Sequence, residues 1–347
     1  MKRFVVLIIC LILMAVLSPY FQGVSSAIDG ETVQYEIFDD DGKLLTFNSE
    51  VFVGDKILNR DFYEYEVYKI EGYKCYARLV RKVDTPIMNS SQKSMAGKQK
   101  RKVCLYMTHN DESYTPTDGY DSIYGAGGIH DVAQKFKEEL ERRKIEVVLD
   151  ETLHIPHNSS AYSRSSVTAT SLLKTEEPDA LFDIHRDGVS KKYYYTNQSG
   201  KDYSKIRIVV GKSNPNFEEN YAFSQKVFAV GNEKYPWLFL DIYCGKGHYN
   251  QSLKNTNLLF EMGTYLIEKE SVFNSVPYLA ETIETAMYEG YSNPENEVVG
   301  EETYQTKNEQ NLQAKKSNNL VPIIIVGSIL GGMLTIALIF SPKQNKN

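Results

Sequence analysis

The residues Val103-Cys-Leu-Tyr-Met-Thr-His109-Asn-Asp-Glu112-Ser113-Tyr114 begin as an apolar, strand-like run and end in a polar turn. The turn carries a histidine and, three positions later, a glutamate. Two later runs share this design: Ala180-Leu-Phe-Asp-Ile-His185 ends in a histidine, and Asn257-Leu-Leu-Phe-Glu261 ends in a glutamate. Open α/β sheets bind their ligands at the carboxyl ends of the strands. The three runs therefore predict one site at that edge of an α/β sheet, built from groups that bind metal or move a proton.

The segment 102–291 around these runs has the pattern of an α/β domain. Strand-like runs alternate with helical ones, which predicts a mostly parallel sheet with flanking helices. Apolar residues after Ile129 recur at a spacing of four, as in an amphipathic helix. Further helices are predicted over residues 161–174 and 217–233. A last helix is expected after Glu261, with Pro277 in its first turn.

Residues 28–84 have the pattern of a small all-β module that precedes this domain. Alternating runs flank the acidic-glycine turn Asp39-Asp-Asp-Gly-Lys43, which is typical of a hairpin, and a second pair of runs surrounds Glu71-Gly72. The many tyrosines of the module favour the packing of a small sheet over glycan binding. Residues 85–101 are polar and have no period, which indicates a linker.

Both ends of the chain predict contact with a membrane. Residues 1–27 combine a basic start, an apolar stretch and small residues, the pattern of a signal peptide or an N-terminal membrane anchor. Residues 292–319 are polar and predict a flexible stalk. Residues 320–340 carry no charge and are long enough for a transmembrane helix. Lysines in the tail 341–347 favour the cytoplasmic side, so we expect a cell-membrane protein whose α/β domain is extracytoplasmic.

Composition excludes several classes of function. The 347 residues carry a formal net charge of -6, whereas a protein that binds nucleic acid normally shows a basic face. Four cysteines, one of them in the N-terminal apolar stretch, make no disulfide framework. The sequence has no phosphate-binding loop, dinucleotide fingerprint or Gly-x-Ser-x-Gly elbow. These observations leave the histidine and carboxylate groups as the main source of chemistry.

The residue types at the predicted edge are those of a zinc site. Catalytic zinc takes three protein ligands, often two histidines and a carboxylate, and polarises a carbonyl. His109, Glu112 and His185 supply that ligand set, and Glu261 is then available as the general base. Taken singly, a His-x-x-Glu pair is common by chance and a histidine after a strand is usually a core or surface residue. The coincidence of three such strand ends favours the metal site.

Other residues near these runs are candidates for support or for substrate binding. Asp183 and Asp187 flank His185, and either carboxylate could orient its ring. Arg164 and Arg186 could hold a peptide carboxylate bidentately, although surface salt bridges explain each of them slightly better. The remaining histidines are left out of the predicted ligand set, because histidines in loops usually face solvent: His130, His154, His157 and His248.

Five blocks of this sequence resemble the stage II sporulation protein P family, and the β module before them looks like the version found in clostridial members. The five blocks occur in the family's order: Thr108–Pro116, Leu181–Asp187, Val210–Asn216, Tyr249–Gln251 and Leu258–Gly263. The resemblance implies a zinc-dependent N-acetylmuramoyl-L-alanine amidase, with endopeptidase action, that cuts stem peptides from peptidoglycan at the septal wall during engulfment. It also implies two partners, stage II sporulation proteins D and M.

The resemblance assigns roles to some of the same residues. By motif position, His109 and His185 correspond to the family's metal histidines and Glu261 to its catalytic glutamate. Glu112 as third ligand rests on the spacing argument. Asn250 lies in one of the five blocks and joins the candidates for substrate binding or support.

Two departures from the family leave competing hypotheses. The family often has a histidine where this chain has Met107, and the C-terminal membrane span is not typical of it. From the resemblance and the predicted membrane segments, we expect a membrane-anchored zinc amidase of peptidoglycan. The alternatives are a zinc endopeptidase that acts within the stem peptide and a non-catalytic membrane protein that binds the cell wall or recruits partners.

Overall fold

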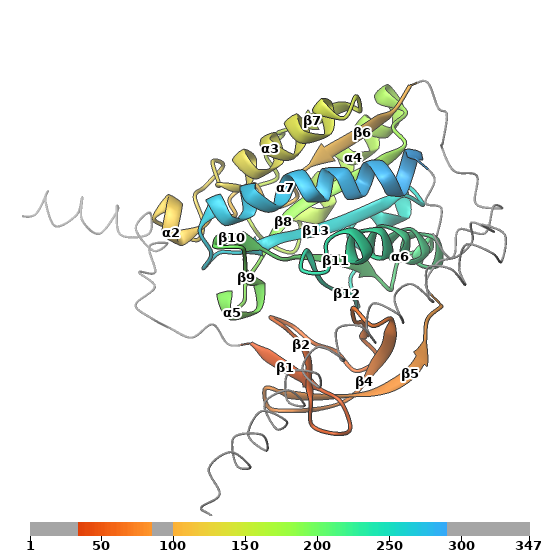
Figure 1. Cartoon of the computed structure of the whole chain (residues 1–347). Coiled ribbons are helices and arrows are strands. Elements are labelled where there is room, and N and C mark those ends of the chain that lie inside the picture. The colour runs from red at the N-terminus through yellow and green to blue at the C-terminus, as the bar shows by residue number, and fades with distance from the viewer. Residues whose placement is uncertain (1–33, 85–99, 290–347) are drawn as a thin grey trace, which may run out of the picture. The chain divides into compact units, whose positions relative to one another are not determined.

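The computed structural model describes residues 34–84 and 100–289 (Figure 1). The segments predicted as signal peptide or anchor, stalk, membrane helix and cytoplasmic tail lie outside these residues, as does most of the predicted linker. Within the described ranges, no helix has the length and apolar character needed to cross a bilayer.

The N-terminal part consists of strands joined by short turns. These are β1 (Tyr35–Phe38), β2 (Leu44–Asn48), β3 (Lys56–Leu58), β4 (Tyr63–Glu71) and β5 (Lys74–Lys82). β1 pairs antiparallel with β2, and β4 with β5, which confirms the two predicted hairpins. Gly72, in the turn between β4 and β5, has a φ of 58°, a conformation that glycine adopts without steric cost.

The C-terminal part alternates strands with helices. Its strands are β6 (Lys102–Tyr106), β7 (Glu146–Asp150), β8 (Ala180–Asp187), β9 (Tyr195–Gln198), β10 (Lys201–Ser204), β11 (Ile206–Gly211), β12 (Phe239–Gly245) and β13 (Asn257–Thr264). Its longer helices are α3 (Ile129–Arg142), α4 (Ala161–Glu176), α6 (Phe217–Lys234) and α7 (Lys269–Glu284). Its shorter helices are α2 (Thr115–Asp118), α5 (Lys191–Tyr194), η2 (Gln251–Leu253) and η3 (Thr285–Glu289).

One mixed sheet of eleven strands runs through both parts, in the order β2-β1-β5-β4-β3-β12-β11-β13-β8-β6-β7. From β12 to β7 every neighbouring pair is parallel except β11 with β13, so the prediction of a mostly parallel sheet holds for this part. β6, β8 and β13 point the same way. Their carboxyl ends therefore meet at one edge, as the sequence predicts.

The prediction of a separate β module needs correction. β3 pairs antiparallel with β12, so the N-terminal strands extend the sheet of the α/β part. Tyr243 of β12 packs in the same apolar cluster as Ile37 and Val67 of the N-terminal strands. Sequence reasoning missed this junction because β3 has only three residues, too few to show a period.

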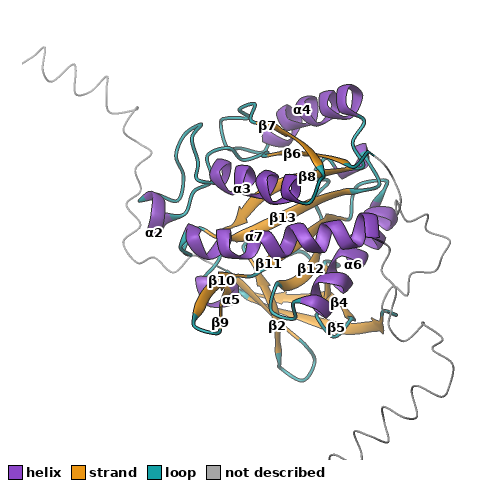
Figure 2. Ribbon diagram, turned by 45° about the horizontal axis from the view of Figure 1, so that its top comes forward, coloured by secondary structure: helices purple, strands orange, loops and turns teal. Residues whose placement is uncertain are grey.

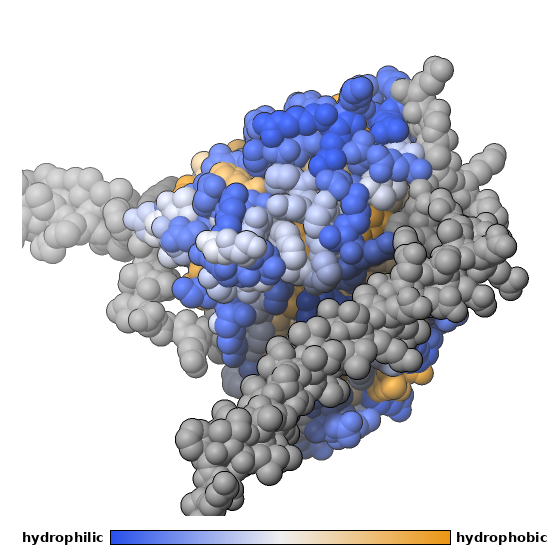
Figure 3. Space-filling model, viewed as in Figure 1, coloured by the Kyte–Doolittle hydropathy of each residue, from blue (hydrophilic) through white to orange (hydrophobic). Residues whose placement is uncertain are grey.

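Helices cover both faces of the C-terminal part of the sheet. α3, α7 and α6 lie side by side on one face (Figures 1 and 2), over a core that includes Phe136, Phe182 and Phe260. α4 packs on the other face against Cys104 and Leu181. The outer surface over α3 and α7 is largely hydrophilic (Figure 3), because the apolar side chains of these helices face the sheet.

The last helix begins earlier than its proline suggests. α7 starts at Lys269, so Pro277 lies inside the helix and not in its first turn. The Lys269 ammonium, nearly buried, contacts Asp118 at 2.5 Å and Asp131 at 2.6 Å. These tertiary contacts fix the start of the helix and outweigh the local preference of proline for a first turn.

Candidate metal centre and active site

The turn that follows β6 is hydrogen-bonded to the residues at the start of α3. The backbone carbonyls of Asn110 and Glu112 accept hydrogen bonds from the amides of Gly127 and Ile129, at 2.9 and 3.0 Å. A Cβ atom at Gly127 would lie 2.3 Å from the carbonyl oxygen of Glu112, so only glycine permits this approach. The turn thereby holds His109 and Glu112 at the carboxyl end of β6.

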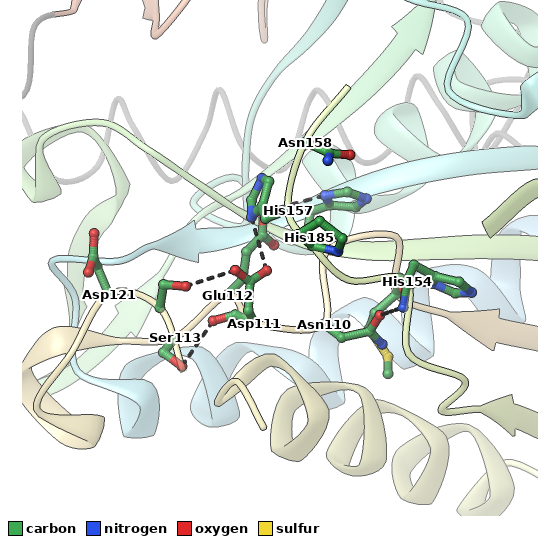
Figure 4. Close-up of polar contacts among 12 residues, drawn as sticks. Asn110, Asp111, Glu112, Ser113, Asp121, His154, His157, Asn158 and His185 are labelled. Atoms are coloured by element: carbon green, nitrogen blue, oxygen red, sulfur yellow. Dashed lines mark hydrogen bonds and ion pairs between the residues drawn. The ribbon is translucent and has the colours of Figure 1, made fainter. Parts of the chain in front are cut away.

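Three side chains from this turn and a neighbouring loop come close enough to share a metal ion. Ligand atoms of His109, Glu112 and His157 all lie within 4.8 Å of one another. The rings of His109 and His157 stack with their centroids 3.7 Å apart. Nδ1 of His157 lies 3.0 Å from Oδ1 of Asp111, and Figure 4 shows His157 above these carboxylates. His157 is thus part of the cluster, although sequence reasoning left it out.

His157 was missed because its loop has no periodic pattern. The available signal is topological: the loop follows β7, which is parallel to β6 and ends at the same edge of the sheet. Arg164 fixes the loop, because its guanidinium donates hydrogen bonds to the carbonyls of His154, at 2.8 Å, and Pro156. The structure therefore gives Arg164 a role in placing His157; its predicted contact with a substrate carboxylate stays a prediction.

The end of β8 brings His185 to the same place. Its Nδ1 lies 3.7 Å from Oε1 of Glu112, and its ring centroid lies 5.1 Å from that of His109. Its Nε2 lies 3.0 Å from Oδ1 of Asp183. The structure thus places the three predicted ligands near one another, although the ligand atoms that all lie within 4.8 Å of one another belong to His109, Glu112 and His157. Asp183 lies beside the ring of the third predicted ligand, His185. The role of these ligands in binding metal remains a prediction.

Electrostatics favours the binding-competent forms of two of these groups. Burial lowers the pKa of His109 to about 4, so its imidazole is neutral at pH 7. Burial opposes ionisation of Glu112, but the nearby His185 and Arg186 lower the pKa of this carboxyl to about 2. Burial also opposes the protonation of His185, yet Asp183 and Glu112 raise its pKa well above the ordinary value. A proton on His185 balances the carboxylates, and a bound cation would take over that balance.

The residues fit a zinc ion. Nδ1 of His109 is buried and has no hydrogen-bond partner among the described residues, although buried polar atoms are normally paired. Imidazole and carboxylate groups are the ligands of catalytic zinc, whose tetrahedral geometry separates neighbouring ligand atoms by about 3.4 Å. The 3.7 Å between His185 Nδ1 and Glu112 Oε1 is close to that spacing.

A buried chain of hydrogen bonds holds Asp183, whose carboxylate lies beside the His185 ring. Asp183 accepts hydrogen bonds from the amide of Thr108, at 2.8 Å, and from its hydroxyl, at 2.6 Å. The Thr108 hydroxyl contacts that of Ser165 at 2.8 Å, and the Asn250 amide donates to Ser165 at 2.9 Å. Asn250 also donates to the carbonyl of Tyr162. The predicted candidate Asn250 therefore supports the ligand shell through α4.

The other two predicted neighbours of His185 have different contacts. The amide of Arg186 donates to Oε2 of Glu112 at 2.9 Å, and its guanidinium donates to the carbonyls of Ser113 and Asp121. Arg186 therefore binds the ligand-bearing turn. Asp187 is buried and accepts hydrogen bonds from Tyr194, at 2.9 Å, and Arg207, at 3.2 Å. These contacts engage Asp187 away from the His185 ring, which leaves Asp183 as the orienting carboxylate.

Glu261 lies beside this cluster on β13, paired in register with His185 of β8. Its Oε2 is buried and has no hydrogen-bond partner in the described part of the chain. Burial and the Asp187 carboxylate raise the pKa of Glu261 to about 8. Glu261 lines a cavity of about 610 Å³ together with Tyr162, whose ring also contacts His109 and His185. A carboxyl group with this pKa can accept or donate a proton near neutral pH.

The unusual Met107 is an apolar core residue. Its side chain is fully buried in the main hydrophobic cluster, and its carbonyl accepts a hydrogen bond from His154 at 2.7 Å. The loop histidine His154 therefore packs against the backbone at the position where the family often has a side-chain imidazole.

The sequence of this chain matches a known protein family. A family model described as Stage II sporulation protein P (SpoIIP) matches residues 66–284. The chain belongs to this family. It is similar to Stage II sporulation protein P of Bacillus subtilis (strain 168), with 31% identity over 182 residues. The match covers 47% of this chain and 45% of the Bacillus protein, so less than half of that relative's length is matched.

Two solved structures show weaker similarity. The N-acetylmuramoyl-L-alanine amidase from Clostridium difficile 630 is 14% identical, with a TM-score of 0.35, and the match covers 54% of this chain and 94% of that one. The CwlD amidase from Clostridioides difficile, solved in complex with the GerS lipoprotein, is 13% identical, with a TM-score of 0.37 and coverage of 54% and 96%. These scores are too low to support an argument about fold or function.

Proposed function

We propose that this chain is a peptidoglycan hydrolase of spore formation, a zinc-dependent N-acetylmuramoyl-L-alanine amidase that cuts stem peptides from glycan strands. Membership of the family supports the sporulation setting. The observation that carries the proposal is the position of Glu261, with an unpaired carboxylate oxygen, on the strand next to His185 in a cluster of imidazole and carboxylate groups.

Different residues of the site would bind the metal ion and transfer the proton during amide hydrolysis. His109, Glu112 and His185 would hold the zinc ion, and His157 is a further candidate ligand from the loop after β7. A zinc ion held there supplies positive charge that polarises an amide carbonyl and acidifies water. Glu261 accepts a proton from the attacking water at Oε2 and donates it to the leaving nitrogen, while the water oxygen bonds to the carbonyl carbon and the C–N bond breaks.

The cellular setting is part of the proposal. The chain would be anchored in the cell membrane through residues 320–340, with residues 102–291 extracytoplasmic, and would act in septal wall thinning and engulfment. The partners we propose are stage II sporulation protein D, a lytic transglycosylase, and stage II sporulation protein M, a membrane protein. A zinc endopeptidase acting within the stem peptide would use the same groups.

Product analysis tests the proposal. The purified chain is incubated with zinc and insoluble peptidoglycan, beside His185→Ala and Glu261→Gln variants, and released products are identified by mass. We expect zinc-dependent release of intact stem peptides that both variants lose. Shortened peptides would instead establish the endopeptidase. Binding to the wall without any release, even with the transglycosylase present, would contradict hydrolysis and favour a recruiting role.

A further inference from the structure

The cavity that contains Glu261 extends onto the N-terminal strands. One wall comes from the α/β part and includes Tyr162, Glu261 and the segment 245–250. The opposite wall comes from the end of β2 and the connection from β2 to β3: Asn48, Ser49, Glu50, Phe52 and Asp55. The family match begins at residue 66, so this second wall lies outside the matched segment. We call it the β2–β3 wall.

A buried arginine binds the end of β2, directly before the β2–β3 wall, and so anchors that wall to the sheet beside Glu261. Arg207 of β11 is 1% exposed and is paired in register with Glu261. Its guanidinium donates hydrogen bonds to the Thr46 hydroxyl, at 2.7 Å, and to the Phe47 carbonyl, at 2.8 Å. The same group binds Asp241 at 2.7 Å. The wall is therefore held in a defined position relative to the proposed base.

Asp55 presents an unpaired acceptor in this wall. It is 1% exposed, and its Oδ2 accepts hydrogen bonds from the Tyr243 hydroxyl, at 2.8 Å, and the Phe52 amide, at 2.9 Å. Its Oδ1 is buried and has no hydrogen-bond partner among the described residues. A buried carboxylate oxygen without a donor is costly. A donor group on a ligand in the cavity would remove that cost.

The other lining groups favour a cationic donor. Four acidic residues line the cavity, against one lysine, Lys246: Glu50, Asp55, Asp187 and Glu261. Asp187 is already paired with Arg207, and the raised pKa of about 8 keeps Glu261 mostly protonated at pH 7, so Glu50 and Asp55 are the carboxylates available to a ligand. Aromatic rings line the cavity too: Phe52, Tyr162, Tyr243 and Tyr249. Carboxylates combined with aromatic faces bind ammonium groups. The chain's own Lys246 ammonium lies 4.7 Å from the centre of the Phe52 ring, which shows the same pairing of ammonium and aromatic face within this cavity.

We propose that the β2–β3 wall is a specificity subsite, in which Asp55 accepts a hydrogen bond from a free primary ammonium group on the side chain of a substrate peptide. This inference rests on the proposed hydrolase function, since it places the peptide in the cavity where Glu261 acts. The subsite selects peptides with an unmodified side-chain amine over those whose amine is acylated.

Binding and hydrolysis are measured with one pair of soluble glycan-peptide fragments, one with a free side-chain amine and one N-acetylated at that amine. Calorimetry uses the zinc-loaded full chain with Glu261→Gln, so binding is measured without turnover. We expect the free amine to bind about tenfold more tightly or better, as for a charge-assisted hydrogen bond. The preference should disappear in Asp55→Asn and fall in Glu50→Gln, a substitution at an exposed position that leaves the core intact. Asp61→Asn, at an exposed site in the turn between β3 and β4, removes an equal charge outside the cavity lining and should keep the preference.

The outcomes separate the subsite from the proposed function. Equal affinity for both fragments overturns the subsite, as does an equal loss of affinity for both in Asp55→Asn. If the amine preference holds but the wild-type chain hydrolyses neither fragment, the subsite stands and the proposed hydrolase function fails.

Discussion

Replacing Glu261 with glutamine should stabilise the metal-free protein at alkaline pH. Burial and the Asp187 carboxylate raise the pKa of Glu261 to about 8, from an ordinary value of 4.5. The folded protein therefore holds this proton more tightly than the unfolded chain, so stability is lost as the pH rises from 4.5 towards 8. Complete linkage would amount to roughly 4 kcal/mol at pH 8 and under about 1 kcal/mol at pH 5. Because Glu261 is partly exposed to the cavity, we expect about 2 kcal/mol at pH 8.

Urea unfolding of chelator-treated protein at pH 5 and pH 8 measures this effect. Glutamine stays neutral at both values, so Glu261→Gln should gain stability at pH 8 and change little at pH 5. Glu270→Gln is the control, because Glu270 is exposed, and it should shift the free energy of unfolding by less than about 0.5 kcal/mol at either pH. A variant less stable than wild type at pH 8, or an equal gain at both pH values, would refute the reasoning that Glu261 is a strained buried carboxyl.

Three further substitutions test other parts of the site. His157→Ala should weaken zinc binding by about 10–100-fold in chelator competition, because His157 stacks on a predicted ligand; unchanged affinity would exclude it from the metal centre. Gly127→Ala should lower the free energy of unfolding by about 1–3 kcal/mol, since its Cβ would meet a backbone oxygen at 2.3 Å. Gly188→Ala, with open space around it, is the matched control and should be nearly neutral in the same urea titration. Arg207→Met should cost about 3–5 kcal/mol in that titration, because it leaves two buried aspartates without their cation; a smaller loss would mean that the aspartates take up protons.

The predicted edge of the sheet was accessible from sequence because buried parallel strands are continuous apolar runs. The runs that end in His109, His185 and Glu261 each became a strand, β6, β8 and β13, and the parallel pairing brought their ends together. His109 follows β6, whereas His185 and Glu261 lie in the carboxyl-terminal halves of β8 (Ala180–Asp187) and β13 (Asn257–Thr264), so the parallel pairing alone brings the three residues to one edge of the sheet.

Other features depend on contacts that local pattern does not encode. His157 joins the cluster through a loop held by Arg164 and Asp111, partners that are distant in sequence or lie in another element. The junction of β3 with β12 is set by pairing between short segments far apart in the chain. The start of α7 is set by the ion pairs of Lys269 and not by the proline within the helix.

These contacts also join the N-terminal strands to the α/β part of the structure. A cut after the N-terminal strands would expose the edge of β12, which β3 now covers, and an open edge strand invites aggregation. The same cut would strip the buried Arg207 guanidinium of the Thr46 hydroxyl and the Phe47 carbonyl, leaving donors unpaired beneath Glu261. It would also remove Asp55 from the cavity wall. The N-terminal strands are therefore a structural part of the candidate active site, even though the pattern of their sequence sets them apart from the α/β segment.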